Sequence, residues 1–176
     1  MATKTLEEYY INNNPGNIKY TGKGGTVGVD YYLSTTGTGI KYRKFNSKAE
    51  GLKGILDVIY GYKTTNVDDI MTKYATDDKS GKAIKNYGAE LRHAYSVAKN
   101  LDYDNNDELK KFIQGVTHFE NSANSQDYRA YYTDKDYEDA IKLFQEERLL
   151  DRGTIQEGET INEQIKDAEM QALNLQ

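Results

Sequence analysis

The stretch SKAEGLKGILDVI, residues 47–59, is where the hydrophobic pattern of the chain changes from a strand period to a helical period. Ser47 and Glu50 have the spacing of a capping box, which predicts that a helix begins at Ser47. Apolar residues at helical spacing behind the cap predict a buried stripe made of Leu52, Ile55, Leu56 and Ile59. Gly51 and Gly54 each cost such a helix about 1 kcal/mol relative to alanine, unless another backbone packs closely there.

On the N-terminal side of this stretch the pattern is that of a β-hairpin. Residues 26–34 and 40–45 have the composition of two strands, and the glycine-containing segment 35–39 connects them. In the first strand every second residue is apolar or aromatic, which predicts one buried face made of Val27, Val29 and Tyr31.

The chain before the hairpin contains a turn and an expected first helix. Residues 12–17, NNNPGN, are a strong turn signal because Asn, Pro and Gly each favour turn conformations. Thr5 and Glu8 again have capping-box spacing, so we expect a short helix that runs into this turn.

On the C-terminal side, helical periodicity continues to Leu150. It predicts helices that begin near Thr65, run from Ile84 toward Asn100, follow Asp107, and follow Thr133 or Asp134. The expected fold is therefore α+β, mostly α-helical, with a short N-terminal β-hairpin and about five helices.

The chain divides into one domain and a short appendage. We assign residues 1–150 to the domain, because apolar periodicity continues throughout them. Residues 151–176 are polar and carry too few apolar side chains to hold a helix on a core alone. We expect this C-terminal extension to become ordered on a partner.

Composition excludes several classes of function. The 176 residues include no cysteine, so disulfides and thiolate metal sites are impossible, and no apolar run approaches the length of a membrane span. Residues 1–53 carry eight Lys/Arg and four Asp/Glu, a net charge of +4, whereas the whole chain carries -5. The basic first third could face an anionic polymer or be an ordinary solvated surface, and the overall acidity argues against nucleic acid as the primary partner.

Three segments resemble a family of phage and prophage virion proteins with a lysozyme-like fold. They are residues 11–20 (INNNPGNIKY), residues 45–52 (FNSKAEGL), and the His-Phe-Glu-Asn run at residues 118–121. They occur in the family's order, and the resemblance covers residues 8–145. In the middle, where the family has Trp-Ala-Pro-Pro followed by Glu-Asn, this chain reads KYATDDKS at residues 73–80. The resemblance implies a lysozyme-like domain, and this departure puts its sugar cleft and activity in question.

The order of these segments is also similar to that of bacterial glucosaminidases of the lysozyme superfamily. That likeness places Glu8 where the catalytic acid ends a helix. Glycoside cleavage requires an acid whose pKa is raised by apolar surroundings, usually opposite a second carboxylate. Glu8 and Glu120 are the candidate catalytic residues. The alternatives are that Glu8 completes a capping box and that Glu120 braces the loop at residues 12–17, through a backbone N–H of that loop.

Amides and aromatic rings suit amino sugars, so Asn14, Asn17 and Tyr20 are candidate substrate-binding residues. The alternative for the asparagines is a rigid turn in which they bond their own backbone. His93 and His118 are far apart in sequence, and no other pattern of metal ligands is present, so we expect no metal site and no cofactor.

Two functions remain open from the sequence. The first is a phage virion-associated, lysozyme-like protein that binds or cleaves peptidoglycan glycan strands when the phage enters its host. The second is a catalytically inactive structural virion protein that keeps the fold for assembly. Both make peptidoglycan or other virion proteins the partners, and both place the protein in the virion after synthesis in the host bacterial cytoplasm.

Overall fold

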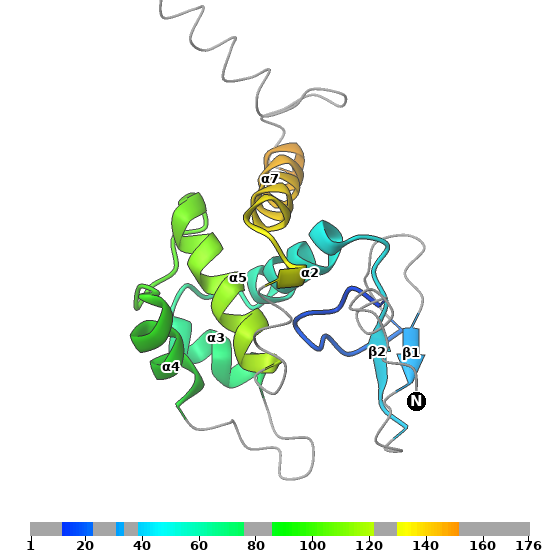
Figure 1. Cartoon of the computed structure of the whole chain (residues 1–176). Coiled ribbons are helices and arrows are strands. Elements are labelled where there is room, and N and C mark those ends of the chain that lie inside the picture. Colours follow the sequence, from blue (N-terminus) through cyan, green and yellow to red (C-terminus); the bar gives the residue numbers. More distant parts are fainter. Residues whose placement is uncertain (1–11, 23–30, 34–38, 76–85, 122–129, 152–176) are drawn as a thin grey trace, which may run out of the picture.

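The structure is a computed structural model that describes residues 12–22, 31–33, 39–75, 86–121 and 130–151. Within these residues lie two strands and five helices (Figure 1). They are β1 (Tyr31–Leu33), β2 (Lys41–Arg43), α2 (Lys48–Gly61), α3 (Val67–Tyr74), α4 (Tyr87–Tyr95), α5 (Asn106–Glu120) and α7 (Asp134–Asp151). The α+β class, mostly helical with an N-terminal hairpin, is confirmed. The expected first helix and residues 152–176 lie outside the described residues.

The two strands form an antiparallel pair in which Tyr32 lies opposite Tyr42. Their rings stack with centroids 5.7 Å apart, and this pair forms the more buried side of the hairpin. Tyr31 is 46% exposed. The expectation that Tyr31 belongs to the buried face is therefore wrong, because neighbouring residues of a strand point to opposite sides and Tyr32 takes the inner one.

The segment before the hairpin runs along β2. The backbone N–H of Tyr20 donates to the carbonyl oxygen of Lys41, and that of Arg43 donates to Ile18, both at 2.9 Å. Residues 12–22 consequently lie between the hairpin and the helices (Figure 1).

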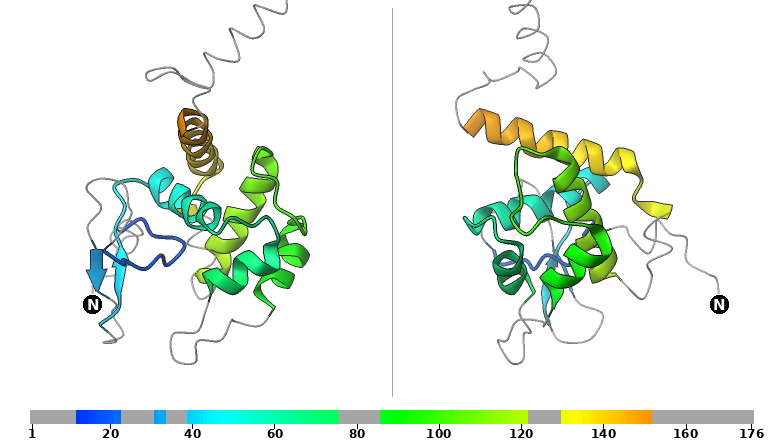
Figure 2. Two further views of the ribbon diagram at one scale, coloured as in Figure 1. Left: turned by 180° about the vertical axis from the view of Figure 1, so that it is seen from behind. Right: turned by 90° about the vertical axis from the view of Figure 1, so that its left-hand side faces the viewer.

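The core lies among the helices and is centred on α2. Ser47 caps α2 by accepting a hydrogen bond from the Glu50 N–H at 3.1 Å, as the capping-box spacing predicted. The predicted stripe is fully buried: Leu52, Ile55, Leu56 and Ile59. α7 lies across α2 and α5 (Figure 2), and its apolar side is buried against them.

Close packing explains the two glycines in the first half of α2. A methyl group at Gly51 would collide with the backbone carbonyl of Asn13. One at Gly54 would lie 2.6 Å from the Phe45 ring. The segment at residues 12–17 thus packs directly on α2, and the cost of the glycines in helix propensity is offset by that contact.

One helix is shorter than the sequence predicts. We expected the helix that contains Leu91 to continue toward Asn100, but α4 ends at Tyr95 and Ser96 adopts a left-handed conformation with φ of 55°. The following residues pair with the connection between α2 and α3 through Val67 N–H to Lys99 O (2.9 Å) and Leu101 N–H to Thr65 O (2.8 Å). These tertiary hydrogen bonds replace the last helical turn.

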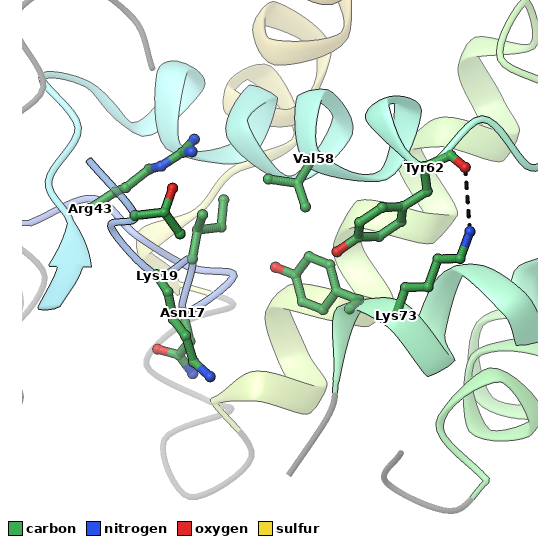
Figure 3. Close-up of a pocket in the computed structure, with 9 residues that line it drawn as sticks. Asn17, Lys19, Arg43, Val58, Tyr62 and Lys73 are labelled. Carbon is green, nitrogen blue, oxygen red and sulfur yellow. Dashed lines mark hydrogen bonds between the residues drawn. The ribbon is translucent and has the colours of Figure 1, made fainter. Parts of the chain in front are cut away.

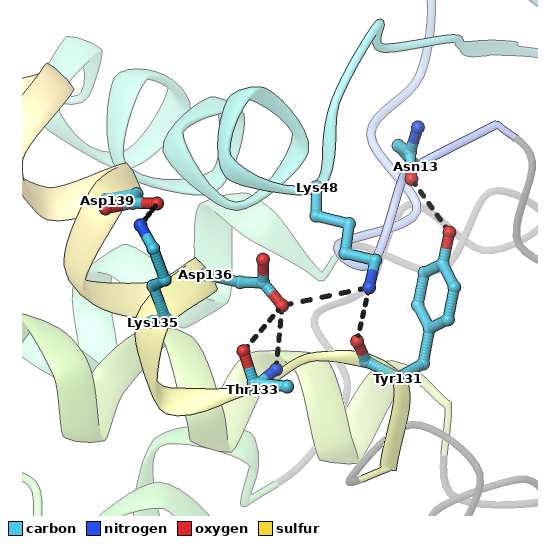
Figure 4. A network of polar contacts seen from close by, with 7 residues as sticks. All are labelled: Asn13, Lys48, Tyr131, Thr133, Lys135, Asp136 and Asp139. Carbon is cyan, nitrogen blue, oxygen red and sulfur yellow. Dashed lines mark hydrogen bonds and ion pairs between the residues drawn. The ribbon is translucent and has the colours of Figure 1, made fainter.

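The start of α7 is joined to the N-terminal segment by polar contacts (Figure 4). Lys48 donates to the Tyr131 carbonyl oxygen at 2.9 Å and pairs with Asp136 at 3.9 Å. The Tyr131 hydroxyl donates to the Asn13 side chain at 3.3 Å. Thr133, directly before α7, donates through its N–H and its hydroxyl to Asp136.

Candidate functional site

The segment at residues 12–17 owes its shape to its asparagines. Asn13 and Asn17 have φ values of 47° and 49°, in the left-handed region. Asparagine tolerates this conformation better than most residues with a side chain, because its short amide bonds to nearby backbone. The turn signal in the sequence therefore corresponds to two specific backbone conformations.

Asn14 holds this segment together from inside. Its side-chain oxygen accepts from the Ile18 N–H at 2.9 Å, and its Nδ2 donates to the carbonyl oxygens of Ile18 (3.0 Å) and Arg43 (2.9 Å). Only 7% of Asn14 is exposed, so this amide is engaged within the protein. Its position fits the alternative interpretation, a rigid turn, and we leave Asn14 out of the candidate site.

Glu120 lies at the end of α5 and contacts the same segment. Its Oε1 accepts from the Tyr87 hydroxyl at 3.0 Å and its Oε2 accepts from Asn17 Nδ2 at 3.1 Å. Asn17 Nδ2 also reaches the Glu120 backbone carbonyl at 3.2 Å. The neighbouring Asn121 donates to the Pro15 carbonyl oxygen at 2.7 Å. The end of α5 thus braces residues 15–17, through side-chain amides rather than the backbone N–H that we expected.

Burial governs the ionisation of Glu120. It raises the pKa of Glu120 above the ordinary value, while the hydrogen bonds from Asn17 and Tyr87 lower it in part. Burial and the nearby Glu120 carboxylate also raise the pKa of Tyr87 well above its usual range. A raised pKa suits a general acid. Both carboxylate oxygens, however, already accept hydrogen bonds from protein groups.

An open cleft of about 310 Å³ lies between the N-terminal segment with β2 on one side and α2 with α3 on the other (Figure 3). Nine residues line it: Asn17, Ile18, Lys19, Thr21, Arg43, Val58, Tyr62, Lys73 and Tyr74. The lining combines two tyrosines and one exposed asparagine with three cations, and none of the nine described lining residues is acidic. Aromatic rings and amides of this kind suit amino sugars.

The aromatic wall of the cleft is fixed by its neighbours. The Tyr74 hydroxyl donates to the Gly16 carbonyl oxygen at 2.6 Å, and burial raises the pKa of Tyr74 well above its usual value. Tyr62 follows the last residue of α2, and its backbone carbonyl accepts from Lys73 Nζ at 3.5 Å (Figure 3). The Tyr74 ring is thereby held against the N-terminal segment, and Lys73 contacts the backbone beside the Tyr62 ring.

Of the predicted site residues that the structure describes, only Asn17 lines the cleft. Glu120 lies behind it and is joined to the cleft through Asn17. Tyr20 packs on Tyr31, with ring centroids 5.1 Å apart, and is not part of the lining. Glu8 lies outside the described residues.

The sequence did not predict the wall of the cleft that lies opposite Asn17, which is formed by Tyr62, Lys73 and Tyr74. These three residues belong to no motif that predicts ligand binding. The chain contains 16 tyrosines, so an individual cleft tyrosine could not be recognised by residue type.

Within the described part of the chain, no group of three or more His, Asp or Glu side chains is placed to hold a metal ion. No helix among the described residues is long and apolar enough to cross a membrane. No protein-family model and no curated protein matches the sequence.

Proposed function

We propose that this chain is a phage virion-associated, lysozyme-like protein whose cleft binds peptidoglycan glycan strands. The observation that carries this proposal is the lining of the cleft: Tyr62, Tyr74 and Asn17 line it together, and the Tyr74 hydroxyl reaches Gly16 beside Asn17. Sugar rings stack on aromatic faces, and acetamido groups exchange hydrogen bonds with amides. The resemblance of residues 11–20, 45–52 and 118–121 to phage virion proteins supplies the biological setting.

The position and contacts of Glu120 favour binding of a glycan strand over its cleavage. Glycoside hydrolysis requires a carboxylic acid that can reach the leaving oxygen. Glu120 does not line the cleft, and its two oxygens accept from Tyr87 and Asn17. We therefore propose that Glu120 positions Asn17. Catalysis by Glu8 remains a separate hypothesis, since Glu8 is not among the described residues.

A catalytically inactive structural virion protein is the second candidate. The sequence departure at residues 73–80 favours it, and so do the contacts that already occupy Asn14 and Glu120. In this case the fold serves contacts with other virion proteins.

Co-sedimentation with purified peptidoglycan sacculi tests the binding proposal. We expect the wild-type protein to sediment with sacculi, Tyr62→Ala to lose most of this binding, and Tyr62→Phe to keep it, because the ring rather than the hydroxyl supplies the stacking surface. Far-UV circular dichroism checks that both variants are folded. A wild-type protein that stays in the supernatant with several wall types would leave the structural candidate.

Muropeptide release from the same sacculi separates binding from cleavage. We expect no release if the cleft only binds. Release that is lost in Glu8→Gln but kept in Glu120→Gln would identify a hydrolase with Glu8 as its acid. Release lost in Glu120→Gln alone, with wild-type binding, would contradict a positioning role for Glu120.

A further inference from the structure

The side-chain amide of Asn17 is held in one orientation by the end of α5. Its Nδ2 donates to the backbone carbonyl oxygen of Glu120 at 3.2 Å and to Glu120 Oε2 at 3.1 Å. A backbone carbonyl oxygen can only accept, so the nitrogen of the amide must face α5 whether or not the Glu120 carboxyl group is ionised. The amide oxygen, Oδ1, therefore takes no part in this contact.

Asn17 Oδ1 is available to a ligand. Asn17 is exposed and lines the cleft, and no donor among the described residues is bonded to this oxygen. None of the other eight described lining residues has a carbonyl or carboxylate oxygen in its side chain. Lysine and arginine only donate, and the hydroxyl groups of tyrosine and threonine can donate or accept. Within the described lining, Asn17 Oδ1 is thus the one side-chain atom that can only accept.

The backbone beside Asn17 is held from two further places. The Tyr74 hydroxyl of α3 donates to the Gly16 carbonyl oxygen at 2.6 Å, and Asn121 Nδ2 donates to the Pro15 carbonyl oxygen at 2.7 Å. Because backbone and amide are already fixed, a ligand that bonds to Oδ1 loses little free energy to the ordering of this segment.

We infer that Asn17 determines the specificity of the cleft for N-acetylated sugars, because its Oδ1 accepts a hydrogen bond from the acetamido N–H of the glycan. This inference rests on the proposed glycan-binding function and adds a residue and a direction of hydrogen bonding to it. Glu120 is the positioning residue, because it holds Nδ2 toward α5 and leaves the oxygen to the ligand. A sugar whose acetyl group is attached through an ester oxygen has the same carbonyl and methyl groups but no N–H, so it would leave Oδ1 unpaired.

The test compares two ligands by isothermal titration calorimetry with the full chain: an N-acetylglucosamine oligomer and the isosteric oligomer in which each acetamido nitrogen is replaced by oxygen. We expect the wild-type protein to bind the ester about tenfold more weakly, because the ligand covers Oδ1 without supplying a donor. In Asn17→Gly the two ligands should bind equally, since the acceptor is absent. Glycine keeps the left-handed backbone of residue 17, whose φ is 49°.

Asn13→Gly is the matched control for the asparagine variant. Asn13 has the same left-handed conformation, with φ of 47°. Its side chain bonds to the Phe45 carbonyl oxygen and to the Tyr131 hydroxyl, and it does not line the cleft. Asn13→Gly should therefore keep the preference of the wild type for the acetamido ligand.

Variants of Glu120 test the positioning role. In Glu120→Leu, Asn17 Nδ2 keeps only the backbone acceptor, so the preference for the acetamido ligand should fall to about threefold. Glu120→Gln should keep the wild-type preference, because the oxygen of the glutamine amide can accept from Asn17 in place of the carboxylate. A merely structural role for Glu120 would change the affinity for both ligands equally and leave their ratio unchanged.

The outcomes are distinct. Equal affinity of the wild-type protein for the two ligands would overturn the role of Asn17 and leave the glycan-binding function standing, as would binding to sacculi but to neither oligomer. Absence of binding to the oligomers and to sacculi would overturn both. A preference that survives in Asn17→Gly, or that is lost equally in Asn13→Gly, would overturn the assignment to the Asn17 amide.

Discussion

At the scale of single residues, two side chains at the ends of distant segments determine how the cleft is built. Asn17 and Glu120 are 103 positions apart in sequence and meet through two hydrogen bonds. Because Asn17 Nδ2 donates to Glu120, the oxygen of the same amide is left to accept from a ligand donor. Glu120 thereby determines which hydrogen-bonding group Asn17 presents.

Replacing Glu120 by Gln should change how stability depends on pH. Burial raises the pKa of Glu120, so the folded protein holds this proton more tightly than the unfolded chain. Its contribution to stability is greatest below the unfolded pKa of about 4.3 and is lost as pH rises through the raised folded value. Relative to the wild type, Glu120→Gln should therefore gain free energy of unfolding as pH rises above the unfolded pKa, measured by urea denaturation.

Tyr87, whose hydroxyl donates a hydrogen bond to Glu120, supplies a second variant that tests this prediction. The Tyr87 hydroxyl favours the ionised form of Glu120, so Tyr87→Phe should make the loss of stability with rising pH steeper. Burial also raises the pKa of Asp57, so some dependence of the same sign should remain in every variant. An unchanged slope in Glu120→Gln would show that the carboxyl group does not titrate differently in the folded protein.

At the scale of elements, α2 organises the molecule because it is in contact on several sides. It packs on α7, α5 and α3, the segment at residues 12–17 lies against Gly51, and the Phe45 ring lies against Gly54. A helix with two interior glycines has weak intrinsic stability. In α2, Gly51 allows the backbone at Asn13 to approach and Gly54 makes room for the Phe45 ring, so tertiary contacts stabilise the helix instead.

The glycines of α2 allow a matched test of this interpretation. Gly51→Ala should lower the free energy of unfolding by about 3 kcal/mol, because the added methyl group collides with backbone rather than with a movable side chain. Gly61→Ala, at the end of the same helix, meets no atom within 4 Å and should be neutral or stabilising by up to about 1 kcal/mol. Chemical denaturation measures both, and equal effects would contradict the packing argument.

At the scale of the whole molecule, the two walls of the cleft belong to parts of unequal stability. The helical wall is continuous with the core, in which Ile59, Ile70 and Met71 are almost completely buried. The other wall depends on a two-stranded sheet whose Tyr31 and Leu33 are 46% and 59% exposed. A two-stranded hairpin is marginally stable without support from other elements. We therefore expect the hairpin side of the cleft to open locally more readily than the helical side.

Hydrogen exchange should reveal this difference. We expect the amides of α2 and α5 to exchange only through global unfolding, and those of Tyr20 and Arg43, which pair along β2, to exchange faster through local opening. Saturating peptidoglycan strands should slow exchange at Tyr20 and Arg43 with little effect on α5. Equal protection of hairpin and helices in the free protein would contradict the unequal stability of the two walls.

The sequence by itself determined the class of fold and most element positions. Capping boxes, a turn segment and two hydrophobic periods are local signals, because a cap or an amphipathic face involves residues within a few positions of one another. This is why the start of α2 and its buried stripe agree with the structure. It is also why Asn17 and Glu120 could be singled out as candidates.

Only the tertiary structure decided the rest. It ended α4 at Tyr95, since the next residues pair with the chain between α2 and α3. It turned Tyr31 outward, buried Asn14, and brought Tyr62, Tyr74 and Lys73 opposite Asn17. These outcomes depend on contacts between segments far apart in the chain. Such contacts form only when several faces are buried together, and no local pattern encodes which residues then meet.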